Sequence, residues 1–410
     1  MSDEAGGIGR LWRTLRPLPV GTHGWRALNE VRQRTWGAVL PLLVLTWHQQ
    51  GAARAPKAKA EALLALGAVL NAAPPPPSTG LVDGRFVLSG REVSAFPPPD
   101  WQLPGARPLE RYEADYLGWA DALVAAATAN GDRAALALCQ QALDGWQQAS
   151  RRLDKAWEPY PRARRCLATL QAAARLTVMA HHGRDRIDPA HQALRDRLLV
   201  VAGAAAAGLD SLAERHLDGN HLLVDRIAAA AAEAVFGTGE SALVAAVTEA
   251  ERQFPRDGGH VEAAPMYHAL LIEDLLVLRG LLGARRPVRQ RLDAVLARAT
   301  AWLAAVRHPD GQLPAFGDTD PRVLQNLPLT RTAVSRTPPG VTDPWQSAWI
   351  SRRGGDLAIV HTAPPAWDPQ PGHAHADHLS VEWSWRDRRV LADAGLAGYE
   401  GDPHLSLIHI

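Results

Sequence analysis

Three short segments of the 410-residue chain concentrate side chains that can bind charged groups or exchange protons: residues 218–221, 257–268 and 372–378. They supply amide, phenol, carboxylate and imidazole groups, and the imidazole changes its charge near neutral pH without help from its surroundings. The segments lie far apart in the sequence. Their chemistry therefore depends on a fold that brings them together.

The first segment, Asp218-Gly-Asn-His, comes directly before an apolar stripe of helical period. Asn220 is therefore interpreted in one of two ways. It is the N-cap of a helix, or it is an amide that holds an anion such as a substrate carboxylate, together with His221 in the first turn. The residues alone leave both interpretations open.

The second segment reads Asp257-Gly-Gly-His-Val-Glu-Ala-Ala-Pro-Met-Tyr-His. Tyr267 is either a packing residue at a helix start or a reactive phenol, because it follows a glycine-rich loop that can approach a ligand. Glu262 allows a further alternative. With Asp318 it could supply the two carboxylates of a glycoside hydrolase, although the sequence does not show that the two face each other.

The third segment, Gly372-His-Ala-His-Ala-Asp-His, precedes a predicted strand. Alternate residues of an extended chain share a face, so His373, His375 and Asp377 point one way. This spacing is typical of metal binding or proton transfer rather than of a solvated loop. Asp393, on the next strand, can lie beside His375. Two candidate ligands fall short of the four that a closed zinc site uses, so the predicted site is incomplete.

Helices must position the first two segments. Alanine and leucine dominate residues 112–302 in stripes of helical period, interrupted by glycine and proline, which predicts successive antiparallel helical hairpins. Residues 1–105 are less regular, include a proline run and a short predicted hairpin over 85–94, and are interpreted as a lead-in that packs on the helices.

Strands must position the third segment, because the apolar period changes from 3.6 to 2 after about residue 341. Leu379, Val381, Trp383 and Trp385 alternate with polar residues, which predicts an antiparallel sheet that buries its apolar face. About 70 residues follow the change of period, whereas a two-sheet sandwich takes about 100, so the predicted sandwich is truncated. Residues 405–410 are expected not to be its native continuation.

The overall composition excludes several classes of protein. Lys plus Arg (44) and Asp plus Glu (43) nearly cancel, which argues against general nucleic-acid binding. The two cysteines, Cys139 and Cys166, lie in predicted helices and are expected to be buried thiols rather than disulfide or zinc ligands. The early apolar run over 38–47 is shorter than the roughly 20 residues of a membrane span. No export signal is recognised, which predicts a soluble, cytoplasmic protein.

Taken together, the chemistry-bearing segments resemble the heparinase II/III-like family of polysaccharide lyases. The matches occur in the family's order over about residues 105–402. They are Trp157-Glu-Pro-Tyr-Pro-Arg, Gly219-Asn-His-Leu-Leu, Gly258-Gly-His-Val-Glu-Ala-Ala-Pro-Met-Tyr-His, Leu313-Pro-Ala-Phe-Gly-Asp-Thr-Asp, Gly372-His-Ala-His-Ala-Asp and Val390-Leu-Ala-Asp-Ala-Gly.

The resemblance implies an α+β multidomain fold. An (α/α) toroid over 106–335 would precede an antiparallel β-sandwich over 341–410, with the lead-in 1–105 against the toroid and the substrate in the cleft between toroid and sandwich. It also implies cleavage of a uronic-acid-containing polysaccharide by β-elimination. That reaction needs the substrate carboxylate to be neutralised so that the C5 proton can leave.

By the same resemblance, Asn220 and His221 hold the carboxylate, and Tyr267 abstracts the proton or protonates the departing oxygen. His373 is the histidine that the sheet domain contributes to catalysis. An unperturbed tyrosine titrates near ~10, so a basic role requires positive charge or hydrogen bonds, for which His268, His221 and His373 are the candidates. His268, Glu262 and Trp157 are expected to contact the substrate.

The family's structural metal, usually zinc, would be held by His375 and Asp393. A further histidine ligand has no counterpart in this chain, and no organic cofactor is implied. The expected partner is an acidic polysaccharide, and family members acting on envelope polymers lie in the periplasm or at the cell envelope. A noncatalytic polysaccharide-binding or capsule-assembly protein is the rival interpretation. The sequence does not identify the polymer, its sulfation, the endo or exo mode, or the oligomeric state.

Overall fold

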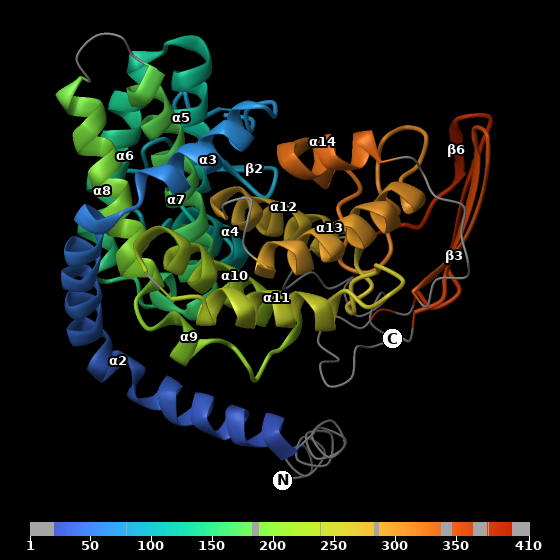
Figure 1. The fold of residues 1–410 in the computed structure, drawn as a ribbon, viewed down its shortest axis with the longest axis horizontal. Coiled ribbons are helices and arrows are strands. Elements are labelled where there is room, and N and C mark those ends of the chain that lie inside the picture. The colour runs from blue at the N-terminus through green and yellow to red at the C-terminus, as the bar shows by residue number, and fades with distance from the viewer. Residues whose placement is uncertain are drawn as a thin grey trace.

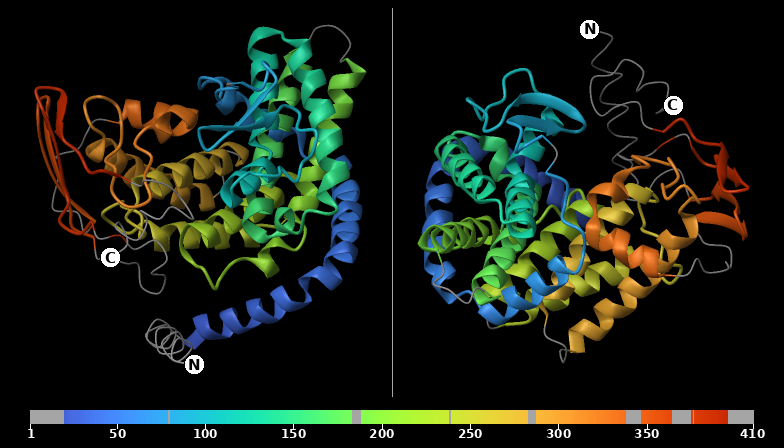
Figure 2. Two further views of the ribbon diagram at one scale, coloured as in Figure 1. Left: turned by 180° about the vertical axis from the view of Figure 1, so that it is seen from behind. Right: turned by 90° about the horizontal axis from the view of Figure 1, so that it is seen from above.

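The computed structural model describes residues 20–78, 80–182, 188–237, 239–282, 287–337, 347–363, 375 and 377–395. In this part of the chain a large helical domain is followed by a small antiparallel sheet, which lies beyond one end of the helices (Figure 1). Seen from above, the helices curve around one another as an incomplete ring (Figure 2). The predicted combination of an (α/α) toroid with an antiparallel sheet domain is confirmed.

The helical domain is one continuous hydrophobic core surrounded by antiparallel helices. Its longer helices are α3 (Ala60–Asn71), α5 (Gly118–Asn130), α6 (Arg133–Ser150), α7 (Pro159–His182), α8 (Pro189–Ala206), α10 (Gly219–Phe236), α11 (Ser241–Gln253), α12 (Pro265–Leu281) and α13 (Pro287–Val306). Shorter ones are α4 (Pro108–Asp115), α9 (Leu209–Leu212), α14 (Pro328–Arg336) and the 3-10 turns Ala55–Lys57, Asp154–Trp157 and Val323–Asn326.

Helix α7 is the centre of this domain. It packs against α3, α5, α8 and α10, and residues on nearly all of its faces are buried. A helix enclosed on every side needs small residues where neighbours approach, and the alanines at 172, 173 and 174 are fully buried. The alanine-rich composition that predicts helices therefore also permits their close packing.

A tryptophan cluster attaches the long helix α2 (Val20–Arg54) to the outside of the ring. The Trp47 ring stacks on Trp157, with 5.8 Å between centroids, and the Arg162 guanidinium lies 3.7 Å from the Trp47 centroid. The indole N–H of Trp157 donates to the Ser150 carbonyl at 2.7 Å. Trp157 is only 1% exposed, so the prediction that it contacts substrate is wrong. Its ring is used for packing instead.

The predicted strands are present in both places. The hairpin of β1 (Arg85–Leu88) and β2 (Arg91–Ala95) confirms the short hairpin expected over 85–94. The C-terminal sheet has the order β3-β4-β5-β6 and is antiparallel throughout. Its strands are β3 (Ala348–Arg353), β4 (Asp356–His361), β5 (Val381–Trp385) and β6 (Arg388–Leu391).

Strand β5 buries the opposite face from the one that its apolar alternation predicts. Glu382 and Ser384 are fully buried against the helical domain, whereas Val381, Trp383 and Trp385 are 40–47% exposed. The polar residues point inward because they have partners there. Glu382 Oε1 accepts from the Ala315 amide at 2.5 Å, and the Ser384 hydroxyl lies 2.7 Å from Nδ1 of His308. The apolar side forms the outer surface of the described sheet.

Two further expectations concern burial and membranes. Cys139 and Cys166 are free, buried thiols, as predicted, and burial raises the pKa of each to about 12. None of the helices in the described ranges combines the length and apolarity that a bilayer span requires.

The contrast between buried and exposed tryptophans predicts their effects on stability. Trp157→Ala should lower the free energy of unfolding by about 3–5 kcal/mol, because it empties a buried ring site and breaks the α2 cluster. Urea denaturation followed by circular dichroism measures this. Trp383→Ala removes the same ring from an exposed strand position and should cost no more than about 1 kcal/mol. Equal losses of unfolding free energy in the two variants would contradict the assignment of Trp157 as a buried ring and Trp383 as an exposed one.

Candidate active site

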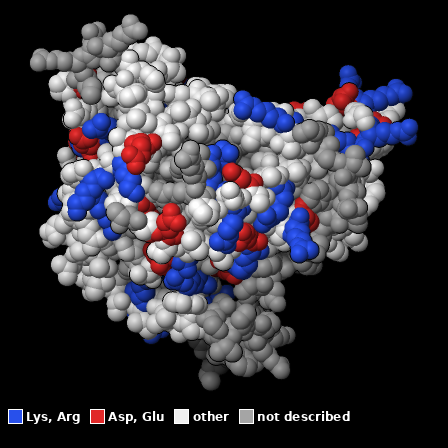
Figure 3. All heavy atoms as spheres, in the orientation of Figure 1, with Lys and Arg blue, Asp and Glu red and all other residues white. Residues whose placement is uncertain are grey.

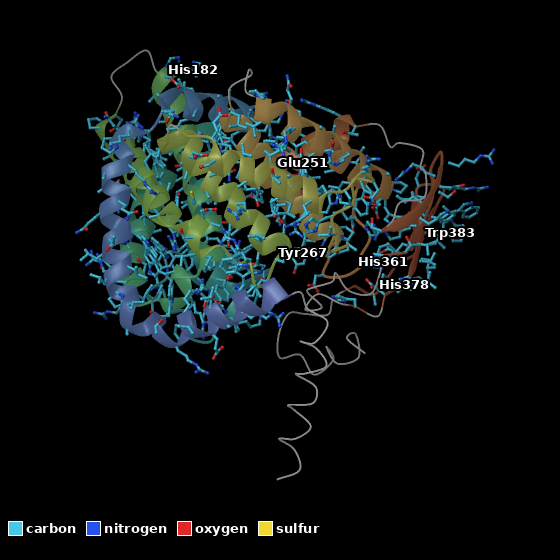
Figure 4. All side chains as sticks on the ribbon, turned by 60° about the horizontal axis from the view of Figure 1, so that its bottom comes forward. His182, Glu251, Tyr267, His361, His378 and Trp383 are labelled. Carbon is cyan, nitrogen blue, oxygen red and sulfur yellow. The ribbon has the colours of Figure 1, made fainter. Side chains whose placement is uncertain are left out.

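The candidate residues lie at the N-termini of α10 and α12, in the loop 313–319 and before β5. Glu262 connects the two helix starts, and Tyr267 and His375 both contact Asp318 in the loop. Figure 4 shows Tyr267 at the end of the helical domain nearest the sheet, with His361 and His378 beyond it. The candidate residues therefore come from both the helical domain and the sheet domain.

The N-terminus of α10 carries Asn220 in its first turn. Asp218 is the N-cap, because its Oδ1 accepts from the Gly219 amide at 2.8 Å, so the interpretation of Asn220 as the N-cap is wrong. Asn220 donates twice to the Glu262 carboxylate, from its backbone N at 2.6 Å and from Nδ2 at 2.8 Å. Gly219 permits this contact, because a Cβ there would collide with Oε1 of Glu262 and its φ is +50°.

His221 lies one residue further along α10 and has two close partners. Its Nδ1 is 2.7 Å from Oε2 of Glu214, and its ring stacks on Tyr160 with 4.3 Å between centroids. The edge of Tyr116 packs on Tyr160 in turn. Burial raises the pKa of Tyr160 to about 12, so this phenol is neutral at physiological pH. Asn220 and His221 are thus adjacent donors, each held by a different glutamate.

Tyr267 links the helical domain to the sheet domain. It lies in the first turn of α12, and its hydroxyl donates to Oδ2 of Asp318 at 3.1 Å. The other oxygen, Oδ1, is 2.6 Å from Nε2 of His375. Tyr267, Asp318 and His375 therefore form one hydrogen-bonded chain. Asp318 has a role that the sequence does not reveal, because its partners are 51 and 57 residues away.

A second contact fixes the loop that carries Asp318. Asp377 Oδ2 accepts from the Gly317 amide at 2.7 Å, and its Oδ1 lies 3.3 Å from Nδ1 of His361. Burial raises the pKa of Asp377, but the hydrogen bond and charge of His361 outweigh this and hold it below its ordinary value. The His361 ring also stacks on Phe316. The loop 313–319 is thereby fastened to the sheet.

His268 is close in sequence to Tyr267 but has a structural role. It is 1% exposed, its Nε2 donates to the Ala299 carbonyl at 2.9 Å, and its Nδ1 accepts from the His260 amide at 3.2 Å. Burial lowers the pKa of His268 to about 4, so the ring is neutral. The prediction that it contacts substrate or supplies positive charge to Tyr267 is therefore wrong, because it is enclosed between α12 and α13.

The predicted zinc ligands, His375 and Asp393, each have a hydrogen-bond partner in the part of the chain that is described. No three His, Cys, Asp or Glu side chains gather there as a metal centre would need. His375 faces Asp318, and Asp393 Oδ1 accepts from the Gly395 amide at 2.9 Å. Zinc binding stays a prediction, and no step is assigned to a metal. His373 lies outside the described residues, so its catalytic role also stays a prediction.

A cavity of about 270 Å³ lies elsewhere, at the C-terminal end of α13. It is lined by Ala304, Arg307, His308, Pro309, Asp310, Gly311 and Arg352. Arg352 donates to the carbonyls of Ala305 and Arg307, which neutralises the exposed carbonyl end of that helix. This arrangement is structural and does not include the residues around Tyr267.

Known proteins share both parts of this architecture. Residues 347–407 match the family described as "Heparinase II/III-like, C-terminal". The crystal structure of heparinase III has a TM-score of 0.59 and 14% identity over 97% of this chain and 69% of that one. The heparan sulfate lyase HepC from Pedobacter heparinus has a TM-score of 0.50 and 17% identity over 81% of this chain. A HepC mutant has a TM-score of 0.51 and 18% identity.

The match is one of fold and of the C-terminal segment. No curated protein sequence matches the chain. The chain spans 57% of the HepC structure's length. Its C-terminal segment 347–407 thus matches the heparinase II/III-like family model, and its helical domain and sheet have the fold of the heparinases.

Proposed function

We propose that the chain is part of a polysaccharide lyase that cleaves a uronic-acid-containing polymer by β-elimination. The observation that carries this proposal is the anchoring of Glu262 to Asn220. Glu262 precedes Tyr267 by five residues, so its two hydrogen bonds tie the start of α12 to the start of α10. The proposed carboxylate-binding pair and the proposed proton-transferring phenol would therefore lie at helix starts that these hydrogen bonds connect.

Asn220 and His221 would neutralise the uronate carboxylate. The C5 proton is acidic enough to leave only when donors stabilise the negative charge that spreads onto that carboxylate. An amide nitrogen has two hydrogens, and Glu262 accepts one from Asn220 Nδ2. The proposal requires a substrate carboxylate to reach the second hydrogen of this side chain, which is 4% exposed.

Tyr267 would transfer the proton. Its hydroxyl donates to Asp318, so the phenol is held by a hydrogen bond with a defined direction. In β-elimination one group removes the C5 proton and one protonates the departing C4 oxygen. A phenol that donates to a carboxylate suits the acid role as it stands, and the basic role would need positive charge or hydrogen-bond donors to offset the Asp318 carboxylate. His373 would be the partner contributed by the sheet domain.

Local donors rather than a broad charged surface would select the polymer. Figure 3 shows basic and acidic side chains interspersed over one face of the molecule. A substrate in the periplasm or at the cell envelope fits the proposal, since acidic polymers are found there.

The second candidate is a noncatalytic polysaccharide-binding or capsule-assembly protein, because the neighbours establish the fold and not the reaction. A hydrolase is less favoured, because both carboxylates that it would use already accept hydrogen bonds within the protein. Glu262 accepts from Asn220, and Asp318 accepts from Tyr267.

Product chemistry tests the proposal directly. The protein is incubated with a panel of uronate polymers, and ultraviolet absorbance follows the unsaturated product that β-elimination alone creates. Reducing ends without that absorbance would indicate a hydrolase, and binding without either signal would indicate the noncatalytic alternative. Either result would refute the lyase proposal.

Tyr267→Phe should reduce kcat by about 10²–10⁴-fold, because it removes the proton-transferring hydroxyl and keeps the ring. Tyr112→Phe is the matched control. It also removes one hydroxyl, which donates to Glu158 at 2.8 Å, and it should leave kcat within about twofold of wild type. Circular dichroism checks that both variants fold. Full activity of Tyr267→Phe would show that another group transfers the proton.

Asn220→Ala should reduce kcat by about 10²–10³-fold, as expected when one donor to a developing negative charge is removed. Leu222→Ala alters the same helix turn without removing a donor and serves as the control. Initial rates over a range of substrate concentrations separate kcat from KM. A change in KM alone would mean that Asn220 binds the ground state and does not stabilise the transition state.

A further inference from the structure

Glu214 is a buried carboxylate placed directly behind His221. Its side chain is 8% exposed, and its Oε2 lies 2.7 Å from Nδ1 of the imidazole. Its backbone N donates to Oδ2 of Asp225 at 2.8 Å. Asp225 lies on α10, one turn after His221, so the segment that carries Glu214 is fastened to the helix that carries the imidazole.

We propose that Glu214 is a positioning residue that keeps a proton on Nδ1 of His221 and directs Nε2 toward the uronate carboxylate. This inference rests on the proposed function, because it adds a layer to the same carboxylate-binding site. It concerns the hydrogen-bond pattern of the site. The glutamate itself does not touch the substrate.

The proton position follows from the chemistry of the two partners. An ionised carboxylate only accepts hydrogen bonds, so a ring nitrogen at 2.7 Å from it must be the donor. Burial raises the pKa of Glu214, but the hydrogen bond and charge of His221 outweigh this, with smaller contributions from His216 and Arg32. The pKa is held below its ordinary value, so Glu214 is ionised at neutral pH.

The surroundings keep the ring in this orientation. Tyr160 stacks on one face of the imidazole at an interplanar angle of 29°, and Tyr116 supports Tyr160 from behind. Rotation of the ring by 180° would move Nδ1 away from Glu214 and would leave that carboxylate without its donor. The loss of a hydrogen bond to a charged group opposes the rotation.

The other charged groups near the pair do not compete for this proton. Burial and the charge of Glu214 raise the pKa of Asp225 well above its ordinary value, and its Oδ2 accepts from the Glu214 backbone N and not from the imidazole. Arg32, from α2, donates to the Leu212 carbonyl at 3.3 Å. Glu262 is engaged with Asn220. Glu214 is therefore the carboxylate that faces Nδ1.

The arrangement leaves one ring nitrogen for the ligand. When the ring is doubly protonated, the Nε2–H is a charge-assisted donor that suits a carboxylate. In the neutral ring that keeps its proton on Nδ1, the Nε2 lone pair would face the substrate anion, so the carboxylate-binding form is the doubly protonated ring, whose positive charge the Glu214 carboxylate stabilises. Glu214 thus determines which atom of His221 meets the substrate, as the orienting carboxylate does for the histidine of a serine protease.

Nitrogen-15 NMR of histidine-labelled protein tests the proton position without using activity. At a pH where His221 is neutral, the wild type should show the proton on Nδ1. His221→Gln assigns the signal by removing it. In Glu214→Gln the Nε2-protonated form should appear, because the amide can accept or donate. Glu61→Gln, an exposed glutamate on α3, is the matched control and should leave the signal unchanged. An Nε2-protonated wild type would overturn the proposal.

Kinetics test the consequence for the site. Glu214→Gln should lower kcat/KM by about 10–100-fold, in line with the loss of a hydrogen bond to a charged group. Glu214→Asp keeps the charge and should recover part of that loss. An unchanged tautomer and an unchanged kcat/KM in Glu214→Gln would overturn the inference. If the wild type forms no unsaturated product, the proposed function fails, and the NMR result still decides the role of Glu214.

Discussion

The two hydrogen bonds between Glu262 and Asn220 are the constraint on which the candidate site depends. They place a carboxylate against the N-terminus of α10, where the unpaired amides and the helix dipole favour negative charge. Gly219 gives that carboxylate room because it has no side chain. The segment from 257 to 264 is thus fixed at the helix end, and Tyr267 follows directly from it.

Further hydrogen bonds make this anchor rigid. Gln253 donates to the Gly219 carbonyl at 2.8 Å and contacts the His260 ring at 2.9 Å, while His268 holds the same loop against α13. On the other side, Asp318 and Asp377 connect the loop 313–319 to the sheet domain. Buried polar groups with complete partners restrict motion, which is what an enzyme needs to hold donors against a developing charge.

The sequence predicted the elements well because their periodicity is a local property. The stripes that end near His182, Gly237 and Gly283 correspond to helices α7, α10 and α12, and the change of period after 341 corresponds to the sheet. Burial was harder to predict, because it depends on what packs against each residue. Trp157 and His268 resemble ligand-binding residues in type and spacing, yet tertiary contacts enclose both.

The prediction of which face of strand β5 is buried was wrong for a related reason. Its residues do alternate between apolar and polar, but the alternation does not show which side faces the helical domain. The polar side faces it, because Glu382 accepts a hydrogen bond from the Ala315 amide and Ser384 contacts His308. Glu214 and Tyr160 were not identified as site residues. Tyr160 lies within the matched segment Trp157-Glu-Pro-Tyr-Pro-Arg, whereas Glu214 carries no motif, and only the fold brings it to His221.

A crystal structure with a bound uronate oligosaccharide is the most direct measurement of the central claim, which is that one sugar acid contacts both helix ends. The account predicts that the carboxylate of one uronate contacts Asn220 and His221 while the Tyr267 hydroxyl lies about 3 Å from C5 or O4 of that same residue. A sugar bound to Asn220 and His221 whose C5 and O4 are out of reach of Tyr267 would contradict it.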